Sequence, residues 1–65
     1  MTYQVQFRNN GKWRRALNDA WHSKLDKAIE RVTKCDPDGL FDPNARIIAD
    51  GFMYTYQDWT NARNK

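Results

Sequence analysis

The chain opens with apolar residues that alternate with polar ones. Tyr3, Val5 and Phe7 are separated by single polar residues, which is the period of a half-buried β-strand. The Asn10-Gly11 pair that follows favours a tight turn. We therefore predict a β-hairpin over residues 3–17, with the turn near its middle.

The length of the turn decides which side chains share a face of this hairpin. A two-residue loop at Asn10-Gly11 pairs Phe7 with Arg14 and places Trp13 on the opposite face. A three-residue loop pairs Phe7 with Trp13 and gathers the apolar residues on one face. We expect the three-residue loop, because it buries more of the apolar side chains together.

A helix is predicted over residues 23–34. Ser23 has the side chain of an N-cap, and Asp26 three residues later suits the first turn. Apolar residues then recur at the spacing of one helical face, at Leu25, Ala28, Ile29 and Val32.

One long helix over residues 12–34, in a β-α-ββ order, is the alternative. It follows from the four-residue spacing of Trp13, Leu17, Trp21 and Leu25. The Asn18-Asp19 pair and the internal cap signal at Ser23 are poor choices for the middle of a helix. We therefore favour the separate hairpin and short helix.

Residues 35–44 are predicted to form an acidic loop of Asp-Pro turns. The residues of Asp36-Pro37-Asp38-Gly39 stand at the positions that a type I turn favours, and Asp42-Pro43-Asn44 repeats this chemistry. Leu40 and Phe41 lie between the two turns. We expect them to plug the core beneath the loop.

A second hairpin is predicted over residues 45–56, followed by a tail at 57–65. Apolar segments flank Asp50-Gly51, which is the strongest short hairpin signal. A two-residue turn there pairs Ala49 with Phe52. The element order is then ββαββ. It predicts a single α+β domain over residues 1–65, an antiparallel sheet with one helix packed on one face.

The 65 residues carry a formal charge of +3 that is unevenly distributed. Residues 1–34 hold eight Lys and Arg against three acidic residues, whereas residues 35–58 hold one Arg against five Asp. Such a division indicates electrostatic steering of one partner more than a general affinity for polyanions.

Several classes of function are excluded by composition. Cys35 and His22 are the only residues of their types, so neither a disulfide framework nor a zinc site of Cys and His fits one chain. The spacing of Asp36, Asp38 and Asp42 is not that of a calcium loop, and the sequence has no phosphate loop or nucleophile motif. We expect a protein that is not an enzyme and uses no metal or other cofactor.

The sequence has none of the usual signals for a membrane. Its mean hydropathy is −1.00, and no apolar run approaches the roughly 20 residues of a membrane span. The first residues lack the basic and apolar regions of a secretory signal. The expected setting is a reduced cytoplasm, with no membrane partner.

Four basic residues of the predicted helix share one face next to the apolar stripe. At about 100° per residue they fall within roughly 80° of each other; they are Lys24, Lys27, Arg31 and Lys34. The plain interpretation is a solvated face whose lysine stems cover the edge of the core. The functional one is a contact for phosphates or an acidic protein surface, with Trp21 or Trp59 as apolar anchor. A tail that packs Trp59 on the sheet is the alternative for that residue.

A second basic cluster surrounds the first turn and comprises Arg8, Lys12, Arg14 and Arg15. In the expected register Lys12 and Arg14 share an exposed polar face with Gln4, Gln6 and Arg8. That face has no aromatic platform on which RNA bases could stack, although Arg and Gln on a sheet can contact DNA. The acidic segment after the helix would oppose binding unless it is turned away.

Two apolar residues are expected on the face of the sheet away from the helix. Ile48 and Met53 lie opposite each other in the second hairpin, where contact with water is otherwise expected. Their position suits a docking partner or a second copy of the chain, so a homodimer is one hypothesis.

Three segments together resemble those of small bacteriophage-encoded accessory proteins. They are Asn-Asn-Gly-Lys-Trp, the helix Leu-Asp-Lys-Ala-Ile-Glu-Arg and the hairpin Arg-Ile-Ile-Ala-Asp-Gly, at residues 9–13, 25–31 and 46–51. The resemblance is architectural. It implies a small ββαββ module of a phage or mobile element that binds and inhibits or modulates a host protein or nucleic-acid-handling complex in the host cytoplasm. A protein-binding inhibitor is therefore the leading hypothesis, and a small basic DNA- or RNA-binding protein is the alternative.

Overall fold

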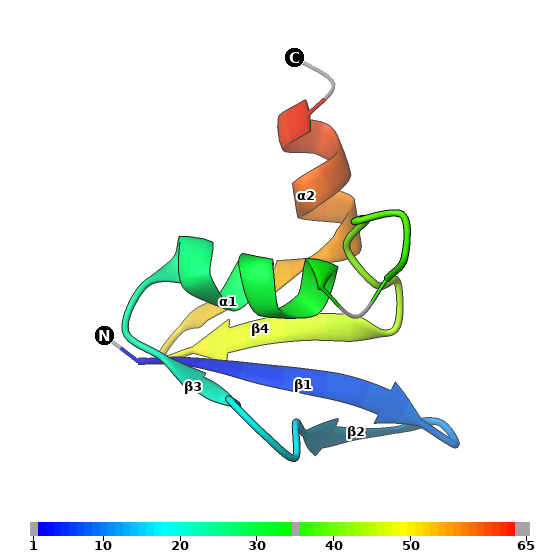
Figure 1. The fold of residues 1–65 in the computed structure, drawn as a ribbon. Helices are drawn as coiled ribbons and strands as arrows, with labels where there is room; N and C mark the ends of the chain where they lie inside the picture. Colours follow the sequence, from blue (N-terminus) through cyan, green and yellow to red (C-terminus); the bar gives the residue numbers. More distant parts are fainter. Residues whose placement is uncertain (1, 35, 64–65) are drawn as a thin grey trace.

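The computed structural model describes residues 2–34 and 36–63 and confirms the α+β fold, with one helix packed against an antiparallel sheet (Figure 1). Cys35, at the start of the predicted acidic loop, lies outside the described residues. The strands are β1 (Tyr3–Asn9), β2 (Lys12–Arg15), β3 (Trp21–His22), β4 (Ala45–Ala49) and β5 (Phe52–Thr55). The helices are α1 (Leu25–Thr33) and α2 (Tyr56–Arg63).

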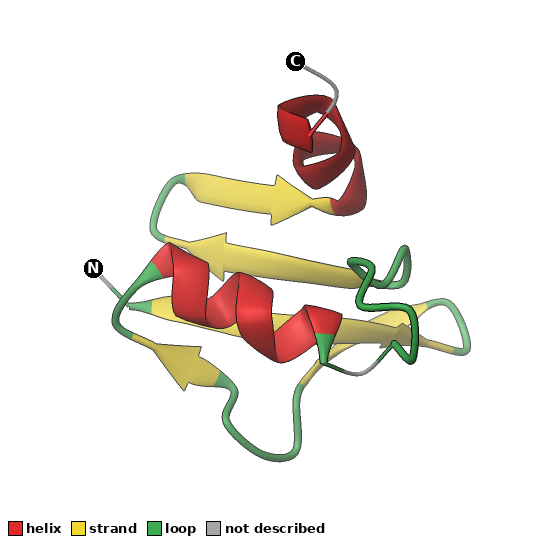
Figure 2. Ribbon diagram, turned by 45° about the horizontal axis from the view of Figure 1, so that its top comes forward, coloured by secondary structure: helices red, strands yellow, loops and turns green. Residues whose placement is uncertain are grey.

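The strand β1 lies in the interior of the sheet. The strand order is β2-β1-β4-β5, and β3 also pairs with β1, near its other end. Helix α1 lies across one face of the sheet (Figure 2). The opposite face is not covered by any element of the described residues, and α2 continues from β5 at the sheet edge.

The core lies between α1 and the sheet. Its largest fully buried side chains are Val5, Val32, Phe41 and Ile47. Phe41 thus plugs the core as predicted, whereas Leu40 keeps 41% of its surface exposed. Asp36 and Asp42 each accept a hydrogen bond from the backbone N–H two residues later, at 2.8 Å. These bonds confirm the predicted turn chemistry of the loop.

The first hairpin has the two-residue turn, so the expected three-residue loop was wrong. Phe7 of β1 lies opposite Arg14 of β2. The two residues of the Asn10-Gly11 turn have φ values of 53° and 78°. Positive φ at both positions is typical of a type I′ turn, whose twist matches that of the flanking strands. As a result, Trp13 lies on the face away from α1.

Strands β2 and β3 are two pieces of one sheet edge, and both pair with β1. Val5 bridges the gap between them. Its N–H donates to the Ala20 carbonyl at 2.7 Å, and its own carbonyl accepts from the Ala16 N–H at 3.0 Å. Residues 17–19 bulge out between these two points, and Leu17 is 98% exposed.

Helix α1 starts later than the predicted range of 23–34. Its N-cap is Lys24, which makes no side-chain capping hydrogen bond, so the predicted cap at Ser23 was wrong. Asp26 stabilises the first turn of the helix instead, because its carboxylate accepts a hydrogen bond from the N–H of Lys27 at 3.0 Å. The alternative helix over residues 12–34 is also excluded, since its first four residues form β2.

The second hairpin has the predicted register, with Ala49 opposite Phe52. Beyond it, where the sequence predicts only a tail over residues 57–65, the chain forms α2. The N–H and Oγ1 hydroxyl of Thr55 both donate to the Asp58 carboxylate, at 3.0 and 3.1 Å. A carboxylate at the third helical position that accepts the N-cap N–H is one half of a capping box, which explains where α2 begins.

Candidate binding surface on the sheet

Alternate residues of the strands point away from α1 and form an exposed surface. Val5 is fully buried under α1, so its neighbours Gln4 and Gln6 point to the opposite side. The strand register then gives the remaining members. We call this set the open sheet face: Gln4, Gln6, Arg8, Trp13, Arg15, Trp21, Arg46, Ile48, Met53 and Thr55.

Trp13 contacts two arginines of the open sheet face. The guanidinium carbon of Arg46 lies 4.2 Å from the centroid of the Trp13 ring, and that of Arg8 lies 5.7 Å from it. Both distances are in the range of cation–π attraction. Because the three residues come from β2, β1 and β4, the contact ties three strands together and positions both positive charges.

Neutral side chains hold the same two guanidinium groups. Arg46 Nε donates to Gln6 Oε1 at 2.8 Å, and Gln6 Nε2 donates to Gln4 Oε1 at 2.6 Å. Arg8 Nη2 donates to Asn44 Oδ1 at 2.8 Å. These bonds orient the guanidinium groups without cancelling their charge. Each bond uses one of the five N–H donors that a guanidinium carries.

The open sheet face is positively charged. Arg8, Arg15 and Arg46 lie on it, and within residues 2–34 and 36–63 none of them has a carboxylate at ion-pair distance. The two ion pairs found in that part of the chain both belong to Glu30 of α1. An anion that reaches this face therefore has no carboxylate of the described residues to displace.

An apolar row crosses one end of the same face. Gln4 has Trp21 of β3 on one side and Ile48 of β4 on the other. Ile48 in turn lies opposite Met53, as predicted, and the homodimer suggested for this pair stays a prediction. Trp21 and Met53 are each 55% exposed, so an accessible indole ring lies on the same face as the arginines.

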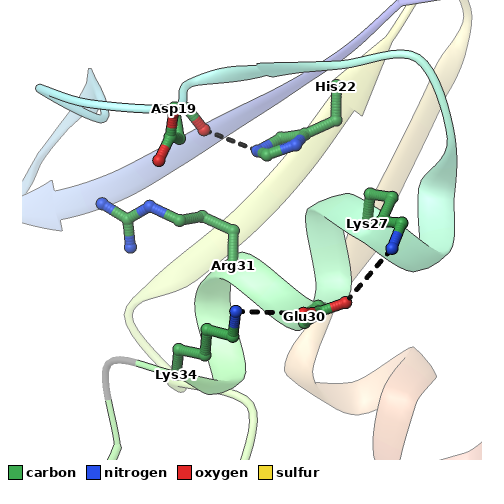
Figure 3. Close-up of a pocket in the computed structure, with 6 residues that line it drawn as sticks. All are labelled: Asp19, His22, Lys27, Glu30, Arg31 and Lys34. Atoms are coloured by element: carbon green, nitrogen blue, oxygen red, sulfur yellow. Dashed lines mark hydrogen bonds and ion pairs between the residues drawn. The ribbon is translucent and has the colours of Figure 1, made fainter.

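The predicted basic ridge runs along α1, in the other layer of the molecule. Lys27 and Lys34 flank Glu30 at 3.8 and 3.0 Å (Figure 3). The hydrogen bond and charge of Lys34, and then the charge of Lys27, lower the pKa of Glu30. Arg31 donates from Nε to the Asn18 carbonyl at 3.3 Å. The ridge borders a pocket of about 180 Å³ and is partly neutralised by its own helix.

The other predicted site residues do not join the ridge in one surface. Trp21 lies across the sheet from it, on the open sheet face. Trp59 of α2 packs against Phe41, with 6.3 Å between ring centroids, so this ring belongs to the edge of the core. Lys12 and Arg14 lie on the α1 side of β2, because the register differs from the expected one.

Three central members of the open sheet face were absent from the predicted site residues: Gln6, Trp13 and Arg46. A two-residue turn at Asn10-Gly11 predicts that Trp13 lies on this face, because Trp13 is then opposite Arg8. Arg46 stands two residues before Ile48, which the sequence already assigned to this face. Side chains alternate between the two faces along β4, so the position of Ile48 also places Arg46 on the open sheet face.

Comparison of the chain with protein-family models, curated proteins and solved structures finds no match. The described part of the chain has no helix with the length and apolar character needed to cross a membrane. It also holds no cluster of three or more His, Cys, Asp or Glu side chains that could bind a metal ion. The resemblance to phage accessory proteins stays a prediction.

Proposed function

We propose that the protein is a non-enzymatic module that binds single-stranded nucleic acid on its open sheet face. The observation that carries the proposal is the placement of Arg8, Arg15 and Arg46, without carboxylate partners among the described residues, on one face with Trp13 and Trp21. Proteins that bind single strands combine a cationic surface for phosphates with rings on which bases stack. This face provides both.

The two kinds of side chain have separate tasks. The three arginines offer guanidinium donors to phosphate oxygens, which attracts and positions the strand. Trp21 offers an exposed ring to a base, and Met53 extends the apolar surface at the same end of the face. Trp13 acts as a positioning residue, since Arg46 already stacks on its ring. The guanidinium plane is itself a surface on which a base can stack.

A single strand fits this face better than a duplex does. Paired bases keep their faces inside the helix, so a duplex would leave Trp21 without a base to stack on. The acidic turns do not oppose binding here. Residues 36–44 lie on the α1 side of the sheet (Figure 1), held there by the buried Phe41. The loop that carries these negative charges is thus in the other layer from the proposed phosphate contacts.

Fluorescence anisotropy with labelled oligothymidylate and oligouridylate of about 12 nucleotides tests the proposal. A duplex of the same length serves as the comparison. We expect the single strands to bind more tightly. The logarithm of the binding constant should fall with the logarithm of salt concentration at a slope near −2, because each phosphate contact of a single strand contributes about −0.7.

Two variants separate the open sheet face from general positive charge. Arg46→Gln should weaken binding severalfold and reduce the slope by about 0.7, the share of one phosphate contact. Lys24→Gln removes one charge at the N-cap of α1, in the other layer, and should change little. Absence of binding at low salt, or equal losses in the two variants, would overturn the proposal.

A protein partner on the basic ridge is the second candidate, and inhibition of a host protein by a phage-encoded module stays a prediction. An acidic partner would have to compete with Glu30 for Lys27 and Lys34. The double variant Lys27→Glu, Arg31→Glu tests this candidate in affinity capture from a lysate with and without nuclease. A captured protein that withstands nuclease and is lost in the double variant would favour it. Capture that disappears with nuclease would favour nucleic acid.

A further inference from the structure

We infer that a second surface, between residues 17–19 and α1, binds an acidic segment of a partner protein through an apolar anchor residue. This inference goes beyond the nucleic-acid binding proposed above, and it is argued from Leu17, Phe7 and Arg14, which are not part of the open sheet face. Its starting observation is Leu17, which is 98% exposed and is the most exposed large apolar side chain in the described part of the chain.

The backbone around Leu17 is fixed in this outward position. Single exposed leucines are common on protein surfaces, so exposure alone decides nothing. Here, however, both ends of the bulge are held, because Ala16 and Ala20 are buried and hydrogen bonded to Val5. Asp19 adopts a φ of 52°, which residues other than glycine rarely do. The sheet edge is interrupted between β2 and β3, and Leu17 is held on the surface at this interruption.

A groove of about 430 Å³ opens beside Leu17. Phe7 lines it, with the Arg31 guanidinium carbon 5.7 Å from the ring centroid, and Arg14 borders it on the β2 side. None of the described residues that line the groove is acidic. Its apolar surface and positively charged border are complementary to an apolar side chain flanked by Asp or Glu.

The chemistry of the groove favours a protein segment over a nucleic acid. Leu17 gives a base no ring to stack on, and the Phe7 ring already has the Arg31 guanidinium over it. Stacking is a main source of affinity for single strands. A leucine gains most from packing against another apolar side chain. Arg14 would then pair with a carboxylate of the same segment, which fixes its position relative to Leu17.

A yeast-displayed library of random peptides, selected on the full chain, tests the inference. We expect the enriched peptides to carry Asp or Glu around an apolar residue. Leu17→Ser should weaken their binding about tenfold or more, the effect of losing one buried leucine side chain. Leu40→Ser is the matched control, because Leu40 is a partly exposed leucine that does not line the groove. It should bind like the unchanged protein.

Two charge-reversal variants test the positively charged border of the groove. Arg14→Glu should weaken the same peptides severalfold, whereas Lys24→Glu, with an equal change of charge at a residue outside the groove lining, should not. Thermal unfolding followed by circular dichroism should show the same midpoint for Leu17→Ser as for the unchanged chain. A loss of binding can then be assigned to the surface and not to the fold.

Several outcomes would overturn the inference. They are a library that enriches no peptide, enriched peptides that are basic, and binding that survives Leu17→Ser. Competition by an oligonucleotide whose own binding depends on Leu17 would assign the groove to nucleic acid instead. The variants used here leave Arg46 and Trp21 intact, so a failure at the groove is distinguishable from a failure on the open sheet face.

Discussion

The Arg46 guanidinium carbon lies 4.2 Å from the ring centroid of Trp13, although the two residues belong to strands that are not neighbours in the sheet. β1 runs between them, and its Gln6 accepts the Arg46 Nε–H at 2.8 Å. The arginine therefore reaches across the neighbouring strand to stack on the indole. This contact places a fixed positive charge over the middle of the open sheet face.

The contact should appear as a coupling free energy in a double-mutant cycle. We expect Trp13→Leu and Arg46→Gln together to destabilise the fold by about 0.5–1 kcal/mol less than the sum of the single effects, the size of a partly exposed cation–π pair. Urea unfolding of the four proteins measures the coupling. A parallel cycle with Arg15→Gln should give a value near zero, because Arg15 has no ring contact with Trp13 in the described structure. Equal coupling in both cycles would contradict a specific stacking contact.

Trp21→Ala should weaken oligonucleotide binding without changing its salt dependence. Loss of one base–ring stack costs about 1–3 kcal/mol, which is roughly a 5- to 150-fold change in Kd. The arginine contacts with phosphates remain, so the salt slope should stay the same. Leu17→Ser, an exposed apolar residue outside the open sheet face, is the control and should bind normally. A reduced slope for Trp21→Ala would argue that the ring acts through the arginines.

Most of the fold could be predicted because local signals decide it. Three such signals each involve only a few neighbouring residues, and the structure agrees with all of them. They are the alternation over residues 3–7, the Asp50-Gly51 turn, and the apolar Phe41 between two polar turns. Helix α2 was missed because its residues show little apolar periodicity. The spacing of Thr55 and Asp58 was nevertheless that of a capping box and would have indicated the start of a helix.

The open sheet face was harder to predict, because a one-residue change of register moves every side chain of a strand to the other face. Trp13 was expected in the core, and an aromatic platform was excluded on that ground. The expected register follows from the burial of apolar residues, whereas the type I′ preference of Asn10-Gly11 decides the observed one. Arg46 is distant from Trp13 in sequence, and only the pairing of β1 with β4 brings the two together.

Gly11→Ala should destabilise the protein by about 1–2 kcal/mol, the cost of a left-handed conformation for a residue with a Cβ. The φ of Gly11 is 78°, and an added Cβ would meet no atom within 4 Å. The cost therefore lies in the backbone and not in a clash. Gly11→Asn is the matched control and should lose less, because Asn tolerates positive φ. Urea unfolding of both variants measures the difference, and equal losses would contradict this explanation.

Phe41→Ala should unfold most of the protein. Phe41 is fully buried and contacts the rings of Tyr54 and Trp59. Truncation of a buried phenylalanine costs about 3–5 kcal/mol, which matches the roughly 3–5 kcal/mol that a core of this size supplies. Near-UV circular dichroism should therefore lose its aromatic signal. Leu40→Ala, the neighbouring and partly exposed residue, should keep the signal, and a folded Phe41→Ala variant would show that the loop is dispensable for the core.

Tyr54 should make the protein less stable at high pH. Burial of its ring, and then the negative charge of Asp58, raise the pKa of Tyr54 above its ordinary value of 10.0 in the folded state. The stabilisation of the neutral phenol is fully present below that ordinary value and is lost as the pH rises through the raised pKa, because the unfolded chain releases the proton first. We expect the free energy of unfolding to fall more steeply above this pH in the unchanged protein than in Tyr54→Phe, which keeps the ring but has no proton to release. Urea unfolding at a series of pH values measures both curves. Parallel curves would mean that the phenol titrates alike in the folded and unfolded states.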